Sequence, residues 1–127
     1  MRLIAVLSLA FCCTFAFTAK AEEAIKAAPP IPEAKKNVDD GKATVIDVRE
    51  KNEFEKGHLA GARNVPLSEL KAGNVPTDLP KDKVIYTHCM KGGRAKEGAV
   101  ILKEKGYNAE PMVVNYEDLT KSWETTK

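Results

Sequence analysis

The pattern of apolar and polar positions along the chain predicts short strands that alternate with short helices. Apolar, β-branched runs predict strands over 44–48 and 62–65, from residue 84 onward, and over 107–114. Amphipathic or charged segments predict helices at 33–40, within 49–56, and at 68–72, 94–106 and 116–123, with Ser68 as a candidate cap. This order predicts an α/β fold with a parallel sheet of about four to five short strands, flanked by helices on both faces.

A six-residue loop before the helix at 94–106 carries the most reactive chemistry. It consists of Cys89-Met90-Lys91-Gly92-Gly93-Arg94. The N–H groups and the positive dipole end at a helix start would surround one small volume, and the two glycines can turn further N–H groups inward. Lys91 and Arg94 add positive charge, and this field favours a thiolate at Cys89. The loop therefore predicts a nucleophilic sulfur in a cradle for a small anion; the alternative is a buried structural cysteine.

Three segments of the chain, in order and spacing, resemble the rhodanese-type sulfurtransferases. They are Cys89-x-x-Gly92-x-Arg94, the run Val45-Ile46-Asp47-Val48-Arg49-Glu50 with Glu53-Phe54, and Gly57-His58-Leu59-Ala60-Gly61-Ala62-Arg63-Asn64-Val65-Pro66. Together they extend over about residues 35 to 107. At 113–117 the chain departs from the family's usual Gly-Gly-hydrophobic turn.

The resemblance implies a rhodanese-like fold and a role for each residue of the loop. Cys89 would attack the outer sulfur of thiosulfate and carry it as a persulfide to a thiol or cyanide. The donor would be bound by Met90, Lys91, Gly92, Gly93 and Arg94. Lys91 and Arg94 would hold the anionic sulfonate end of this small donor. The mechanism needs no cofactor and no metal.

Four other polar residues are candidates for a catalytic or supporting role in the site. Asp47 and Arg49 close the first strand, either as neighbours of the anion site or, as we favour, as a supporting ion pair between strand and loop. His58 lies in the family's turn motif and is expected to shape that turn. His88 directly precedes Cys89, and adjacent strand residues point to opposite faces, so it is a poor candidate for the base that activates the thiol.

Two other classes of protein remain as alternatives. Cysteine phosphatases and arsenate reductases also use a Cys–Arg anion loop, but they place five residues between cysteine and arginine, and this chain places four. A non-enzymatic persulfide carrier or thiol-sensing module shares the first half-reaction and differs only in the absence of turnover.

The start of the chain has the three parts of a secretory signal peptide. Residues 1–21 contain a basic start, an apolar run and the Ala19-Lys20-Ala21 cleavage motif, which predicts cleavage after Ala21 and a periplasmic or secreted protein. Removing this segment also removes Cys12 and Cys13, so Cys89 would have no internal disulfide partner in an oxidising compartment.

Composition changes the picture once the predicted signal peptide is removed. The chain of 127 residues has 20 basic and 18 acidic residues, and loss of Arg2 and Lys20 leaves equal numbers of each. We therefore expect no nucleic-acid or membrane partner after cleavage. Residues 22–32 are expected to form a flexible proline-rich arm, and residues 33–127 one rhodanese-like domain. A small thiol or cyanide is the expected acceptor, with a protein thiol as a further candidate.

Overall fold

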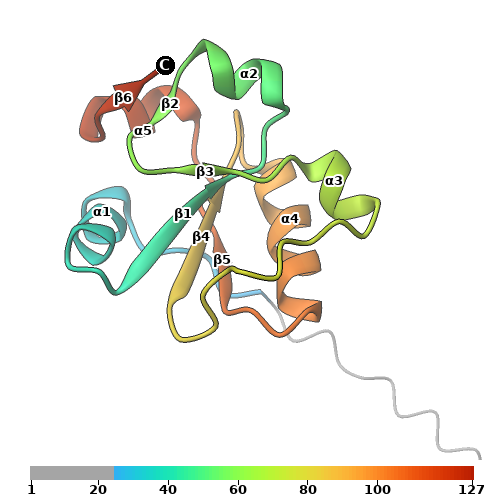
Figure 1. The fold of residues 1–127 in the computed structure, drawn as a ribbon. Helices are drawn as coiled ribbons and strands as arrows, with labels where there is room; N and C mark the ends of the chain where they lie inside the picture. Colours follow the sequence, from blue (N-terminus) through green and yellow to red (C-terminus); the bar gives the residue numbers. More distant parts are fainter. Residues whose placement is uncertain (1–24) are drawn as a thin grey trace, which may run out of the picture.

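The computed structural model describes residues 25–127, and the predicted signal peptide at 1–21 lies outside these described residues. The elements follow one another as α1 (Ile31–Asp39), β1 (Ala43–Asp47), α2 (Lys51–Lys56), β2 (His58–Leu59), β3 (Arg63–Asn64), α3 (Leu67–Lys71), β4 (Val84–His88), α4 (Gly93–Glu104), β5 (Ala109–Pro111), α5 (Tyr116–Ser122) and β6 (Thr125–Thr126). Figure 1 shows them in chain order by colour.

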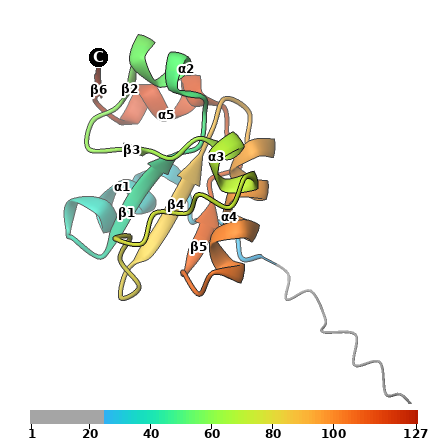
Figure 2. The same ribbon diagram turned by 45° about the vertical axis from the view of Figure 1, so that its right-hand side comes forward.

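The main sheet has four strands in the order β3-β1-β4-β5, and all neighbours are parallel. Helices cover it on both sides: Figures 1 and 2 show α3 and α4 on one side, and α1 and α5 on the other. The predicted α/β architecture is thereby confirmed. The two central strands, β1 and β4, are in register from Ala43 opposite Val84 to Asp47 opposite His88, so they end side by side at the same edge of the sheet.

Two hydrophobic cores hold the layers together, and the alternation along the strands decides which residue enters which core. On β4, Ile85 packs with the α3 and α4 side, whereas its neighbour Tyr86 packs with the α1 and α5 side. Both side chains are at most 2% exposed. Nearly continuous apolar strands are typical of a parallel sheet buried on both faces.

A second, two-stranded sheet was not predicted from the sequence. Strand β2 pairs antiparallel with β6, with His58 opposite Thr126 and Leu59 opposite Thr125. Neither strand exceeds two residues, too short for an apolar alternation to show in the sequence. This pairing brings the C-terminal residues of the chain beside α2 (Figure 1).

Several predicted boundaries differ from the observed ones. Helix α1 begins at Ile31 rather than at residue 33, because a proline in the first helical turn lacks only an N–H that has no partner there. Ser68 does not cap α3, whose N-cap is Pro66; its hydroxyl instead donates to a carboxylate oxygen of Glu50 at 2.8 Å. The last parallel strand is shorter than the expected 107–114 and lies at the sheet edge, where Pro111 is tolerated.

The segment that precedes α1 lies along this edge strand. The Ala28 N–H donates to the Pro111 carbonyl oxygen at 2.9 Å, and the Lys26 ammonium lies 3.4 Å from the Glu110 carboxylate. Residues 25–30 therefore cover the outer side of β5. Across residues 25–127, no helix has the length and apolar character needed to cross a membrane.

Candidate active site

The loop that begins at Cys89 lies where β4 passes into α4, in the middle of the sheet. Strand β4 ends at His88, and helix α4 starts at Gly93 after the turn. The Thr87 hydroxyl donates to the Ala95 carbonyl oxygen at 2.8 Å, which ties the end of the strand to the first turn of the helix. The carboxyl ends of central parallel strands are where ligands bind in open α/β sheets.

The Cys89 side chain is buried against the start of this helix. Its Sγ atom accepts the Gly92 N–H at 2.9 Å and the Ala95 N–H at 3.4 Å, and only 1% of the residue is exposed. Both donors belong to the N-terminal turn of α4, whose dipole presents its positive end there. Backbone N–H groups in this arrangement stabilise negative charge on the sulfur.

The two glycines of the loop have different roles in it. Gly92 has φ of +102°, in the left-handed region that favours glycine. A Cβ atom there would lie 2.9 Å from Cγ1 and 3.0 Å from Cα of Val113. Gly93 has no such φ, and a Cβ atom on it would meet nothing within 4 Å. Gly92 therefore forms the turn that presents its N–H to Cys89, and Gly93 is the first residue of the helix.

The two cations of the loop are in different environments. Arg94 forms a bidentate ion pair with Glu53 of α2, with Nη1 to Oε1 at 2.6 Å and Nη2 to Oε2 at 3.1 Å. Hydrogen bonding to Arg94 lowers the pKa of Glu53, and the same pair raises the pKa of Arg94. Lys91 is exposed and has no ion-pair partner within residues 25–127. The guanidinium expected to hold the donor anion is thus already paired.

A buried ion pair supports the site from the neighbouring strand. The Arg49 guanidinium donates to both oxygens of Asp47, with Nη2 to Oδ2 at 2.7 Å, and both side chains are at most 3% exposed. Nη2 also donates to the Gly57 carbonyl oxygen at 2.8 Å, and Cζ lies 4.2 Å from the centre of the Tyr116 ring. Arg49 therefore links the end of β1 to the turn after α2 and to α5.

The contacts of the two histidines indicate structural rather than catalytic roles. His58 stacks on Phe54 with ring centres 3.6 Å apart, and its Nδ1–H donates to the Phe54 carbonyl oxygen at 2.9 Å. His88 is fully buried, with Nε2 3.7 Å from Asp47 Oδ2. Burial lowers the pKa of His88 despite the nearby carboxylate, so the ring is neutral at pH 7. Within residues 25–127, neither ring nitrogen of His88 forms a well-aligned hydrogen bond.

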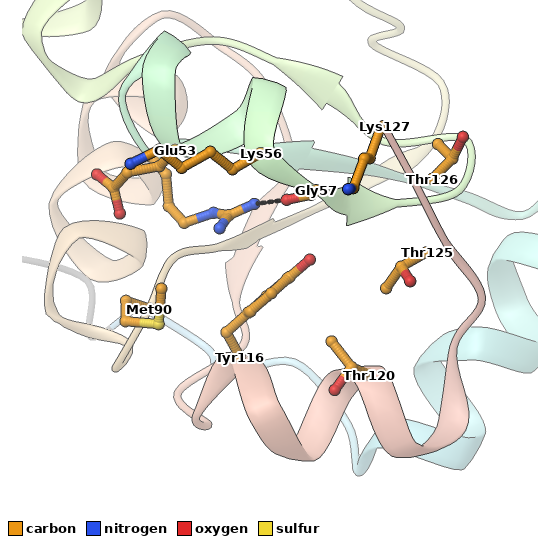
Figure 3. A pocket seen from close by; sticks show the side chains of 10 residues that line it. Glu53, Lys56, Gly57, Met90, Tyr116, Thr120, Thr125, Thr126 and Lys127 are labelled. Atoms are coloured by element: carbon orange, nitrogen blue, oxygen red, sulfur yellow. Dashed lines mark hydrogen bonds between the residues drawn. The ribbon is translucent and has the colours of Figure 1, made fainter.

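A pocket of about 730 Å³ opens beside the loop. Figure 3 shows Met90 at one end, the Tyr116 ring in the middle, and Glu53, Lys56 and Lys127 above it. The Tyr116 N–H donates to the Met90 carbonyl oxygen at 2.9 Å, which connects the start of α5 to the loop. Cys89 is not among the lining residues, so Met90 is the loop residue that faces the pocket. Among the residues described, no cluster of histidine, cysteine and carboxylate side chains could hold a metal ion.

Two residues of this site were not assigned from the sequence. Glu53 was noted only as part of a motif, and nothing in the sequence pairs it with Arg94, 41 positions later. A partial signal was the spacing of Glu50 and Glu53, which form a capping box at the start of α2 and so fix the position of Glu53. Tyr116 lies in the segment that departs from the family pattern, and no spacing rule predicted its contact with Arg49.

Fold, loop and buried supports together define a rhodanese-type α/β domain. Residues 31–126 match the family model described as "Rhodanese-like domain", and the chain belongs to this family. A solved structure of a rhodanese-related protein from Thermoplasma volcanium covers 80% of this chain and 97% of its own length, with a TM-score of 0.67 and 24% identity, which shows the fold.

Three curated bacterial proteins are similar to parts of the chain. "Uncharacterized protein YqhL" of Bacillus subtilis is 46% identical over 65 residues, which are 51% of this chain and 50% of that protein. "Putative sulfur carrier protein YrkF" of the same species is 33% identical, over 70% of this chain and 46% of its own length. "Thiosulfate sulfurtransferase PspE" of Escherichia coli is 35% identical, over 49% of this chain and 60% of its own length. The chain spans about half the length of the first curated relatives it matches.

Proposed function

We propose that this domain is a sulfurtransferase that moves a sulfane sulfur from thiosulfate to a thiol or cyanide acceptor through a persulfide on Cys89. The observation that carries the proposal is the acceptance of two backbone N–H groups by Cys89 Sγ at the start of α4. Donors in this position stabilise an anionic sulfur both before attack and after a second sulfur has been added.

The reaction has two balanced steps. In the first, the Cys89 thiolate attacks the outer sulfur of thiosulfate, a new S–S bond forms, and the bond to the sulfonate sulfur breaks with release of sulfite. In the second, the acceptor thiolate or cyanide attacks the terminal sulfur of the persulfide and leaves with it. The Cys89 thiolate is then regenerated without any net oxidation of the protein.

The pocket beside Met90 supports the entry of both substrates. Within the described residues, Lys91 is the loop cation without an ion-pair partner, and Lys56 and Lys127 line the pocket beside Glu53, so an anionic donor would meet positive side chains there. An acceptor thiolate benefits from the same charge. A small thiol and a cysteine on a partner protein are both compatible with a pocket of about 730 Å³ that is open to solvent.

A persulfide carrier is the second candidate function. One relative with 33% identity over 70% of this chain is named a putative sulfur carrier protein. A carrier uses the same first step, but it gives its sulfur to one partner and does not turn over with small acceptors. Sustained release of sulfite separates the two functions.

The phosphatase and arsenate-reductase alternative receives less support from the geometry. Four residues separate Cys89 from Arg94, one fewer than in those families.

The test is the variant Cys89→Ser, compared with the wild type in a sulfite-release assay with thiosulfate and cyanide. Serine nearly matches cysteine in size but forms no persulfide, so turnover should disappear while the circular dichroism spectrum is unchanged. Mass spectrometry of the wild type treated with thiosulfate alone should show a gain of about 32 Da. Peptide mapping should locate it on Cys89. Turnover by folded Cys89→Ser, or an unmodified Cys89 in the wild type, would contradict the proposal.

A further inference from the structure

The ion pair between Glu53 and Arg94 joins two parts of the site that the sequence keeps far apart. Glu53 lies on α2 and lines the pocket, and Arg94 lies in the first turn of α4. Their side chains are 29% and 33% exposed, so solvent and dissolved anions reach the pair. Glu53 Oε1 also lies 3.4 Å from the Glu50 N–H in the capping box, which holds the carboxylate from its own helix.

The pair changes the charge that an approaching anion meets. The loop carries two cationic side chains, and the Glu53 carboxylate neutralises one of them through both guanidinium arms. Lys91 is left as the loop's cation without an ion-pair partner in the described part of the chain. A doubly charged donor would gain more from a free Arg94 than a singly charged donor of the same size, because the attraction scales with the product of the charges.

We propose that Glu53 is a specificity-determining residue, which keeps Arg94 neutralised and thereby lowers the preference of the site for dianionic over monoanionic sulfur donors. This inference rests on the proposed sulfur-transfer function and refines its substrate class. Thiosulfate remains a donor, but its kcat/KM is lower than it would be with a free Arg94. Monoanionic sulfane donors such as thiosulfonates or persulfides are therefore used better relative to thiosulfate.

Methanethiosulfonate is the matched monoanionic probe, because it replaces one charged oxygen of thiosulfate with a methyl group. It transfers its outer sulfur in the same way and releases methanesulfinate in place of sulfite. The ratio of kcat/KM for thiosulfate to that for methanethiosulfonate therefore measures selectivity for donor charge. A purely structural role of Glu53 would change both values together and leave this ratio constant.

The experiment compares the full-length wild type with Glu53→Gln, which keeps an oxygen acceptor for Arg94 but removes the negative charge. We expect the ratio to rise roughly tenfold, mainly through a lower KM for thiosulfate, which corresponds to about 1.4 kcal/mol. Inhibition by sulfate, a dianion that transfers no sulfur, should strengthen by a similar factor.

The control variant is Glu55→Gln, which removes the same charge from the same helix. Glu55 is exposed, and its carboxylate lies 3.8 Å from the Lys51 ammonium, whereas Arg94 forms its ion pair with Glu53. The donor ratio and the sulfate inhibition should change less than twofold in this variant. An equal effect of both substitutions would show that overall charge, not the pair, sets the preference, and would overturn the proposal.

An unchanged donor ratio and unchanged sulfate binding in folded Glu53→Gln would also overturn the proposal. If this variant does not fold, Glu53→Asp replaces it: the shorter carboxylate cannot bond both guanidinium arms equally well, so the ratio should shift in the same direction by a smaller factor. An Asp variant with the wild-type ratio would contradict the inference.

Direct binding of sulfate separates this proposal from the proposed function. Calorimetric titration of wild type and Glu53→Gln with sulfate requires no turnover. If Cys89 takes up no sulfur from either donor, the sulfur-transfer function fails, and the titration alone decides the role of Glu53. Tighter sulfate binding in Glu53→Gln supports the role of the pair, and equal binding refutes it.

Discussion

Replacement of Gly92 by alanine should damage both the fold and the chemistry, whereas the same change at Gly93 should not. An alanine at φ of +102° is strained by about 1–2 kcal/mol. Its Cβ atom would lie 2.9 Å from Val113 Cγ1, an overlap that costs about 1–3 kcal/mol in a packed interior. The two effects together predict a loss of about 2–5 kcal/mol, a large part of the stability of a typical domain.

The chemical effect follows from the hydrogen bond that this turn provides. The Gly92 N–H donates to Cys89 Sγ at 2.9 Å, and relief of the strain would rotate that N–H away. Loss of one such donor lowers kcat by about 10²–10³-fold in other enzymes. Gly93→Ala is the matched control: it has open space and ordinary helical geometry, and it should stabilise the domain by about 0.4–1 kcal/mol.

The assay combines urea unfolding, followed by the fluorescence of the buried Trp123, with sulfite release from thiosulfate. We expect Gly92→Ala to unfold at lower urea and to lose activity under conditions where it is still folded. Gly93→Ala should unfold at equal or higher urea and keep its activity. Equal behaviour of the two variants would show that backbone geometry at Gly92 does not organise the site, and the reasoning above would be wrong.

Two further predictions concern the groups beneath the loop. Arg49→Met leaves the fully buried Asp47 carboxylate without its guanidinium and should cost about 3–5 kcal/mol in urea unfolding; the double variant Asp47→Leu/Arg49→Met should lose less than the single one, and a larger loss would contradict this account. Burial lowers the pKa of His88 in the native state. Below about pH 6.5 the unfolded chain therefore binds a proton that the native state does not bind, so the free energy of unfolding should fall as pH decreases through that value. The urea midpoint should therefore drop between pH 7.5 and pH 5.5, and His88→Gln should show a smaller drop; an equal drop would assign the effect to other groups.

Much of the main sheet could be predicted from local pattern. The apolar runs that became β1 and β4 are buried on both faces, and such runs have few alternatives to a covered parallel strand. The helix after the loop could also be predicted, because Ala95, Ala99 and Leu102 recur at helical spacing and all are fully buried. The pairing of β2 with β6 was missed, since two-residue strands have no periodicity to detect.

The position of the proposed nucleophile, Cys89, could also be derived from the sequence. A cysteine directly after a strand, followed by two glycines and a helix, has backbone N–H groups near its sulfur for local geometric reasons, and the structure has two of them there. The sequence alone did not show that the two glycines have different roles. Gly92 differs from Gly93 only in its positive φ and in its proximity to Val113, and both are features of the folded chain.

The charge of the site was decided by tertiary structure. The sequence showed two cations in the loop, Lys91 and Arg94, and suggested that both face the donor. The fold brings Glu53 from a different helix into contact with Arg94, across 41 positions of sequence. Short-range patterns report propensity and burial, but an ion pair between distant residues depends on how the elements pack. For this reason the sequence by itself determined where the candidate sulfur of Cys89 lies, and only the folded chain determined the charge around it.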